Sequence, residues 1–326
     1  MNKKVGYAIA LALALAAPFY GYPVFLMKLL CFALFACAFN LLIGYSGLLS
    51  FGHAAFFGGA GYVTGYALRT WGWSTELGLL AGVATGAFLG LVMGGLAIRR
   101  QGIYFTMITL ALAQMVYFLA LRLPFTGGED GLQGVPRGTL LGTIDLGNDM
   151  VLYYLVLAIF IAGFALIVRT IHSPFGQVLK AIKENEPRAI SLGYDVNKYK
   201  LMAIVLSASL AALAGATKTL VLGFETLTDV YWGMSGLVVL MTLVGGMGTL
   251  AGPIIGAVLI IALENKLGDV GLFLASHTGV EWFGTLGESV GIVTGIIFVI
   301  CVLMFRRGIV GEAIARFGNR AVKPTA

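Results

Sequence analysis

Residues 24–45, VFLMKLLCFALFACAFNLLIGY, decide the class of fold, because they form an apolar run with a single charged residue, Lys28. A helix of this length spans the hydrocarbon core of a bilayer, which is about 30 Å thick. Runs of similar length recur along the chain, and only 11% of the 326 residues are charged, against about 25% in a soluble domain. The sequence therefore predicts an all-α, polytopic membrane protein.

The apolar runs set the expected topology. We expect membrane-spanning segments at residues 5–21, 24–45, 47–68, 77–97, 102–121, 151–168, 201–223, 233–263 and 289–305. The tract 233–263 is long for one pass, and GGMGTLAGP in its middle offers a break. Two passes there give ten crossings and place most of the 21 Lys and Arg residues inside, whereas one pass gives nine crossings and an outer C-terminus. We expect one transmembrane domain, residues 1–326, with broken or re-entrant helices and both termini in the cytoplasm.

The first span has an alternative interpretation. MNKK followed by a short apolar stretch with small residues is compatible with a cleaved secretory signal covering residues 1–21. Its removal leaves the orientation of the later spans unchanged. We expect the span to be retained.

The loop 169–200 is predicted to form a pair of short helices on the cytoplasmic side. Ser173 suits an N-cap, and Pro174 suits the first helical position, which needs no amide donor. Pro187 follows the start of a second helix, and Gly193 can end it in a left-handed conformation. Such a pair outside the bilayer predicts a docking site.

An apolar stripe runs along the first of these two helices. Its members at i, i+3, i+4 and i+7 are Phe175, Val178, Leu179 and Ile182. The stripe could enter a groove on a partner protein, or it could lie on the inner leaflet. The glutamates Glu184 and Glu186 argue against the leaflet.

Few polar residues lie within the spans. Asn40, His53 and Gln114 are candidates for lining a transport pathway, although such groups also link neighbouring helices. Lys28 and Lys218 lie near the outer ends of their spans, where they can snorkel to the interface. No acidic residue lies at mid-membrane, which argues against a proton- or sodium-driven carrier.

Glycine is the second organising feature of the chain. The 46 glycines concentrate in three tracts, residues 44–66, 82–95 and 233–256. Close helix packing explains most of them, and paired broken helices along a transport path are the alternative.

The remaining segments and motifs limit the function. Residues 122–150 and 264–288 are too polar to cross the membrane and are expected to be outer loops, either docking surfaces or solvated loops. The sequence has no GxxxxGK[ST] loop, no HExxH and no CxxC, and its three cysteines lie in apolar spans. We therefore expect no catalytic residue, no metal site and no nucleic-acid binding.

Several segments resemble the permease subunits of branched-chain amino acid ABC importers, and among them the LivM-type subunit. They are NLLIGYSGLLSFGHAAFFGGAGY, TGGEDGLQGVP, SPFGQVLKAIKENEPRAISLGYDVNKYK, VVLMTLVGGMGTLAGPIIGA and FRRGIVGE, in the family's order from about residue 35 to 312. One departure is Leu237, where many relatives have an acidic residue.

The resemblance implies partners and roles. It implies a bacterial inner-membrane importer of leucine, isoleucine or valine, with a second permease subunit, two ATP-binding subunits and an extracytoplasmic binding protein. ATP and Mg would bind the ATPases, and this chain would need no cofactor. The implied ATPase-coupling residues are Ser173, Pro174, Phe175, Gly176, Val178, Leu179, Ile182, Glu184, Glu186 and Gly193. Gly127, Gly128, Asp130 and Gly131 would face the binding protein.

Three alternative functions remain open at the level of sequence. A permease for urea or short-chain amides shares the loop signatures. A carrier or channel working without an ATPase is also compatible with the spans. An inactive subunit that scaffolds a second permease is the third alternative.

Overall fold

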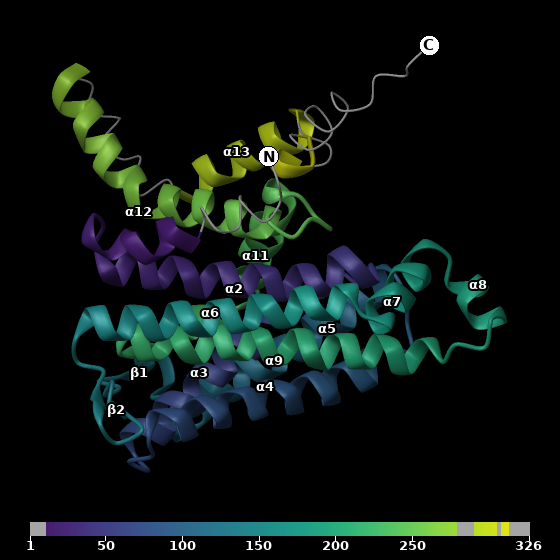
Figure 1. The fold of residues 1–326 in the computed structure, drawn as a ribbon, viewed down its shortest axis with the longest axis horizontal. Helices are drawn as coiled ribbons and strands as arrows, with labels where there is room; N and C mark the ends of the chain where they lie inside the picture. Colours follow the sequence, from purple (N-terminus) through teal and green to yellow (C-terminus); the bar gives the residue numbers. More distant parts are fainter. Residues whose placement is uncertain (1–10, 279–289, 305–307, 313–326) are drawn as a thin grey trace. The chain divides into compact units, whose positions relative to one another are not determined.

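The computed structural model describes residues 11–278, 290–304 and 308–312 as helices joined by short loops (Figure 1). Contacts divide the chain into two compact units, one ending at Gly236 and one beginning at Leu237. The long helices are α2 (Pro23–Ser46), α3 (His53–Arg69), α4 (Thr75–Ala97), α5 (Ile103–Arg122), α6 (Asp149–His172), α9 (Val196–Leu222), α11 (Trp232–Gly245), α12 (Gly252–Thr278) and α13 (Val290–Met304). The short helices are η1 (Ala17–Phe19), η2 (Pro124–Thr126), η3 (Gly128–Asp130), α7 (Pro174–Glu184), α8 (Glu186–Ser191) and α10 (Leu227–Val230).

Strands make a minor contribution to the described residues. β1 (Leu132–Gln133) pairs with β4 (Phe224–Glu225), and β2 (Thr139–Leu140) pairs with β3 (Ile144–Asp145), both antiparallel. These pairs lie at one end of the first unit, hereafter the strand end, and α7 and α8 lie at the opposite end, the α7–α8 end (Figure 1).

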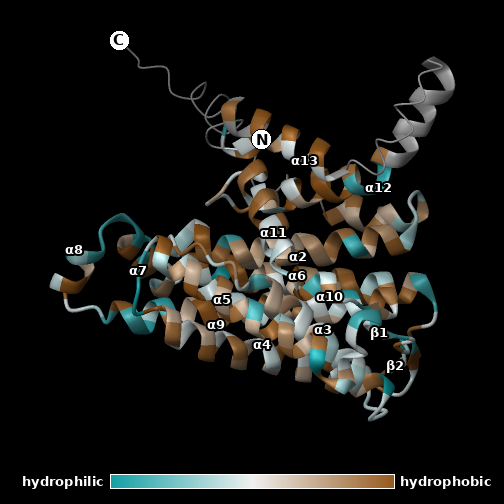
Figure 2. Ribbon diagram, turned by 180° about the vertical axis from the view of Figure 1, so that it is seen from behind, coloured by the Kyte–Doolittle hydropathy of each residue, from teal (hydrophilic) through white to brown (hydrophobic). Residues whose placement is uncertain are grey.

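The polytopic helical class is confirmed. Within the described residues, α2, α4, α5, α6 and α9 are long and apolar enough to cross a membrane, and they coincide with five of the expected spans. Figure 2 shows hydrophilic residues gathered at the strand end and at the α7–α8 end, with apolar helix surface between them. The number of crossings stays a prediction.

Two boundaries differ from the expectation. α3 begins only at His53, so the first part of the span 47–68 is not helical. α12 continues to Thr278, so the first half of the expected loop 264–288 is helical, because its charges exclude a crossing but not a helix. Residues 279–289 lie outside the described residues, as do residues 1–10 of the first span.

The break expected in the tract 233–263 is confirmed. α11 ends at Gly245 and α12 begins at Gly252. A Cβ on Gly256 would lie 1.8 Å from the carbonyl oxygen of Met241, so the two helices approach too closely for any larger residue. The glycines therefore serve close packing here.

α2 and α9 are the most buried of the five long apolar helices. In the most hydrophobic stretch of each helix, 78% of the residues of α2 and 67% of those of α9 are buried, against 22% to 33% in α4, α5 and α6. The peripheral helices therefore present their apolar surface, including Phe88, Met107 and Phe118, outward, as expected in lipid.

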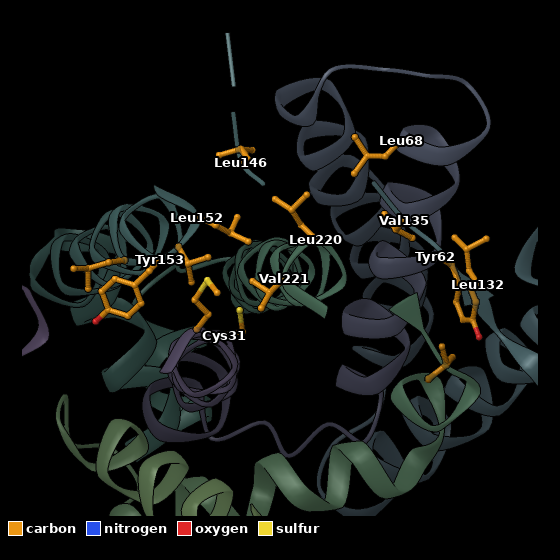
Figure 3. Close-up of a cluster of buried hydrophobic side chains, with 14 of the residues drawn as sticks. Cys31, Tyr62, Leu68, Leu132, Val135, Leu146, Leu152, Tyr153, Leu220 and Val221 are labelled. Atoms are coloured by element: carbon orange, nitrogen blue, oxygen red, sulfur yellow. The ribbon is translucent and has the colours of Figure 1, made fainter. Parts of the chain in front are cut away.

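The strand end closes over a buried hydrophobic cluster. Figure 3 shows loop residues Leu132, Val135 and Leu146 among side chains of the helices, such as Leu68 and Leu220. Leu132, Val135 and Leu146 therefore anchor the polar segment 122–150 to the bundle, while most of its other residues are exposed.

A glycine ridge on α4 allows it to pack closely on α9. The ridge consists of Gly82, Gly86, Gly90 and Gly94, one per helical turn, and a Cβ on each would meet α9 within 3.1 Å. At Gly86 that Cβ would lie 2.1 Å from the Cβ of Ala212. Small residues at this spacing let helix backbones approach in a membrane, where no hydrophobic force drives association.

We expect Gly86→Ala to lower the free energy of unfolding by about 1–3 kcal/mol, because α4 and α9 must separate to admit the methyl group. Gly95→Ala is the matched control, since nothing lies within 4 Å of its added Cβ. Chemical denaturation in mixed micelles measures both variants. Equal free energies of unfolding for the two variants would contradict close packing of the glycine ridge on α9.

Candidate functional site

The connection between α2 and α3 is a non-helical segment inside the first unit. α2 ends at Ser46, and Gly47 takes a left-handed conformation with φ of 75°, which reverses the chain. The side chain of His53, the first residue of α3, bonds Ser207 in α9 at 2.9 Å, and Ser207 donates to the carbonyl oxygen of Ala38 at 2.6 Å. Ala38 lies about two turns before the end of α2. Residues 47–52 therefore run back into the bundle without forming a helix.

Hydroxyl groups from two other helices satisfy the backbone of this segment. Thr106 Oγ1 on α5 donates to the carbonyl oxygen of Leu49 at 2.9 Å, and Thr109 Oγ1 accepts from the amide of Phe51 at 3.2 Å. Ser235 on α11 donates to the carbonyl oxygen of Phe51 at 2.8 Å. Non-helical backbone at membrane depth persists only where it is buried in protein or lines a water-filled path.

Ser235 also bonds the beginning of α3. Its Oγ accepts from the amide of Ala54 at 2.9 Å, so one hydroxyl holds both sides of the helix start. The sequence-based selection of Asn40, His53 and Gln114 missed Thr106, Thr109 and Ser235, because hydroxyl residues are common in spans. Ser235 lies in the glycine-rich tract 233–256, which was its available signal, whereas Thr106 and Thr109 had none.

The three residues expected to line a pathway occupy different environments. His53 is buried, with the rings of Phe39 and Phe56 at its edges, and its bond to Ser207 joins α3 to α9. Asn40 is buried on α2, and Gln114 is half-buried on α5. The contacts of His53 are those of a link between helices, and a pathway role for all three stays a prediction.

The strand end contains a buried cluster of charges. Lys218, near the end of α9, pairs with Glu225 at 3.4 Å and with Asp229 at 2.5 Å. Thr219 Oγ1 donates to Glu225 Oε2 at 2.5 Å. The interpretation of Lys218 as a snorkelling side chain is wrong, since it is only 3% exposed. After α9 the chain folds back, so that Glu225 on β4 and Asp229 on α10 both reach Lys218, which the linear sequence does not reveal.

The glycine-rich loop at the strand end joins this charge cluster through β1. Leu132 pairs with Glu225 in the β1–β4 ladder, and a Cβ on Gly131 would lie 2.4 Å from the carbonyl oxygen of Glu225. Gly127, Gly128 and Gly131 all have positive φ values, so a turn requires them. Of the four loop residues implied by the resemblance, only Asp130 has an exposed charged side chain. Its role toward a binding protein stays a prediction.

The expected helix pair is present at the α7–α8 end. Ser173 Oγ accepts from the amide of Gly176 to cap α7, and Asn185 Oδ1 accepts from the amide of Arg188 to cap α8. Gly193 has φ of 88° after α8. A Cβ on Gly176 would lie 2.4 Å from the carbonyl oxygen of Thr170, so α7 approaches the end of α6 closely.

The apolar stripe of α7 faces this chain, although Phe175 and Val178 are only half-buried, and its entry into an ATPase groove stays a prediction. Leu179 and Ile182 are 0% and 2% exposed. Phe175 stacks on Tyr199, and Val178 packs beside Ile182. Periodicity identifies a face that becomes buried but not the surface that buries it. Leu179→Asp and Ile182→Asp are therefore expected to disturb folding, not coupling alone.

Charged residues of the pair also bond the bundle. Lys183 Nζ donates to the carbonyl oxygen of Gly44 at 2.7 Å, at the C-terminus of α2. Glu186 accepts from Gln101 at 2.8 Å and pairs with Lys200 at 2.6 Å. Neither Lys183 nor Glu186 therefore serves only as the rim of a partner's groove, because both bond elements of this chain.

An exposed apolar patch remains on the helix pair. Ile190, Leu192 and Tyr194 are 57%, 68% and 41% exposed, at or directly after α8. The three residues form what we call the α8 patch. Sequence reasoning missed the patch because its members do not fall on one helical stripe.

We expect Ser235→Ala to lower the free energy of unfolding by about 1–3 kcal/mol, because the carbonyl of Phe51 and the amide of Ala54 lose their side-chain partner. Ser209→Ala is the control, since its hydroxyl bonds only the carbonyl of Val205 in its own helix. Denaturation of both variants in micelles gives the comparison. If Ser235→Ala lowers the free energy of unfolding no more than the control does, Ser235 is not needed for the structure.

Glu225 makes stability depend on pH. It lies between α9 and α10, where burial raises the pKa of its carboxyl from 4.5 to about 8, with Lys218 acting in the opposite direction. Since the folded state holds this proton more tightly than the unfolded state, stability falls as pH rises from 4.5 to about 8. Glu225→Gln is expected to remove this decline and to be the more stable protein above pH 8. Thermal unfolding across that range measures it, with Glu129→Gln, exposed at the same end, as the control that keeps the wild-type profile.

Comparison with known proteins places the chain in a family. The family model described as the branched-chain amino acid transport system permease component matches residues 23–302. The high-affinity branched-chain amino acid permease LivM of Escherichia coli is 26% identical over 300 residues, covering 82% of this chain and 69% of that protein. The autoinducer 2 import permease LsrC of Klebsiella pneumoniae is 32% identical, covering 57% of this chain and 53% of that protein. The ribose import permease RbsC of Bacillus subtilis is 32% identical, covering 60% and 58%. With a family match over most of its length, this chain belongs to the branched-chain amino acid transport system permease family.

Proposed function

We propose that this chain is the permease subunit that carries leucine, isoleucine or valine across the bacterial inner membrane in an ATP-driven importer. Membership of the permease family and the five apolar helices make it a multi-pass membrane subunit of an ABC-type importer. The segment 47–52 is the main support for a transport pathway in this chain, because its backbone is non-helical and is held by hydroxyl groups between helices. Broken helices of this kind form substrate sites in transporters.

The α8 patch supports docking of a separate ATPase. The sequence lacks a phosphate-binding loop, so ATP and Mg would be held by two partner subunits. Ile190, Leu192 and Tyr194 offer an apolar anchor outside the bundle, and the bonds of Lys183 and Glu186 would transmit movement of the pair to α2 and α9. The α7–α8 end would then be cytoplasmic, and both termini would lie on that side.

The strand end would face the binding protein. Asp130 and its neighbour Glu129 are exposed on the loop whose β1 strand pairs with β4. A second permease subunit would complete the pathway against this chain. In this proposal the chain itself would need no cofactor.

Ribose or a related polar solute is the second candidate substrate. The ribose permease RbsC covers 60% of this chain at 32% identity, a higher identity over a shorter stretch than LivM. The leucine proposal rests on the wider coverage of LivM. ATP-driven uptake by the complete transporter in proteoliposomes, measured for leucine, ribose and urea, separates the candidates. Uptake of leucine is expected, and uptake of ribose or urea without leucine would overturn the proposed substrate assignment.

We expect Leu192→Asn to weaken ATPase binding at least about tenfold, because it removes an apolar anchor from the α8 patch. Leu141→Asn is the control. It makes the same change at a side chain that is 75% exposed at the strand end, and φ of 52° there suits asparagine. Co-purification of the ATPases and ATP-driven uptake are measured together. Normal binding by Leu192→Asn would exclude the patch as a docking site.

A further inference from the structure

A polar cavity lies at the α7–α8 end of the first unit. It has a volume of about 210 Å³, and its walls come from the end of α2, the turn before α5, the α7–α8 pair and the first turns of α9. Gly47, Gln101 and Gly102 line one side, and Lys183, Glu186 and Lys200 line the other. Because α2 ends and α5 begins here, the cavity lies at the level where a membrane changes from hydrocarbon to headgroups.

The charges around the cavity favour an anion. Glu186 is already occupied, since one of its oxygens pairs with Lys200 and the other accepts from Gln101. The ammonium group of Lys183 has hydrogens to spare beyond its bond to Gly44, and it forms no ion pair with the residues that the structure describes. The lining therefore has a net positive charge.

Two further cations stand beside this lining. Arg99 and Arg100 are exposed and directly precede Gln101 in the chain. Across the described part of the molecule, no carboxylate lies within ion-pair distance of either. They extend the positive surface from the cavity toward the turn between α4 and α5.

An apolar surface begins at the rim of the same cavity. Directly after Gly102, α5 exposes Ile103, Tyr104 and Met107, which are 77%, 71% and 61% accessible. Positive groups above an apolar helix face match an amphiphile whose phosphate meets the cations while its acyl chain lies along the helix. A free anion would use the cavity but would gain nothing from the surface of α5.

We propose that this cavity binds the phosphate headgroup of an anionic phospholipid, with the acyl chains lying on the first turns of α5. The lipid joins the α7–α8 pair to α2 and α5 and holds the pair in place on the bundle. It acts as a resident ligand and is distinct from the transported solute. The inference rests on α2 and α5 spanning the membrane and is independent of the proposed substrate.

The test uses the complete transporter in nanodiscs of phosphatidylcholine, with or without phosphatidylglycerol. Lys183→Met keeps the apolar stem and removes the charge, and Arg100→Gln removes a second cation. Each variant is expected to lower the retention of phosphatidylglycerol, measured by native mass spectrometry, by about fivefold. Lys198→Met is the control, because Lys198 lies in the first turn of α9 and pairs with Asp195 on the surface.

Thermal unfolding supplies the second measurement. Phosphatidylglycerol is expected to stabilise the wild type and the Lys198→Met protein, but not Lys183→Met. If phosphatidylglycerol stabilises Lys183→Met as much as it stabilises the wild type, the lysine only caps α2 and the proposal fails. If inorganic phosphate in phosphatidylcholine nanodiscs stabilises the wild type as well as the lipid does, the site takes a free anion and the lipid is excluded. Leucine uptake is measured in a separate experiment, so the lipid result can be interpreted even if the proposed substrate is wrong.

Discussion

The structure of the first unit depends on one constraint, the need to satisfy every backbone polar group without water. The helices meet this need internally, but the segment 47–52 cannot. Hydroxyl groups on Thr106, Thr109 and Ser235 replace the missing helical bonds. This arrangement fixes where α3 begins and brings α5 and α11 against the same stretch of backbone. A break that would be costly in lipid thereby becomes a stable feature inside the first unit.

Close packing and charge placement follow from the same constraint. Apolar side chains gain little by leaving lipid for a neighbouring helix, so α4 relies on its glycine ridge to reach α9. The charged residues that form ion pairs within the described part of the first unit lie at its two ends. At the strand end Lys218 pairs with Glu225 and Asp229 in a buried cluster, and at the other end Lys183 and Glu186 tie the α7–α8 pair to the bundle.

These two charged ends give a physical basis for a transport cycle. The loop at the strand end is joined by β1 to the strand that carries Glu225, and the α7–α8 pair is bonded to the ends of α2 and α9. A force on either end therefore acts on the central helices and not on a slack loop. In an importer this is the mechanical requirement for linking a solute donor on one face to an ATPase on the other.

The helical membrane class, five of the spans, the break in the tract 233–263 and the α7–α8 pair were all predictable from the amino-acid sequence. Composition, capping residues and glycine placement encode these locally. Three features required the folded chain: the surface that buries Leu179 and Ile182, the pairing of Lys218, and the three hydroxyl groups that hold the segment 47–52. Each of these depends on partners far away in the chain. An apolar stripe, a lysine or a serine has the same local pattern whether its partner is lipid, another protein or a distant helix of the same chain.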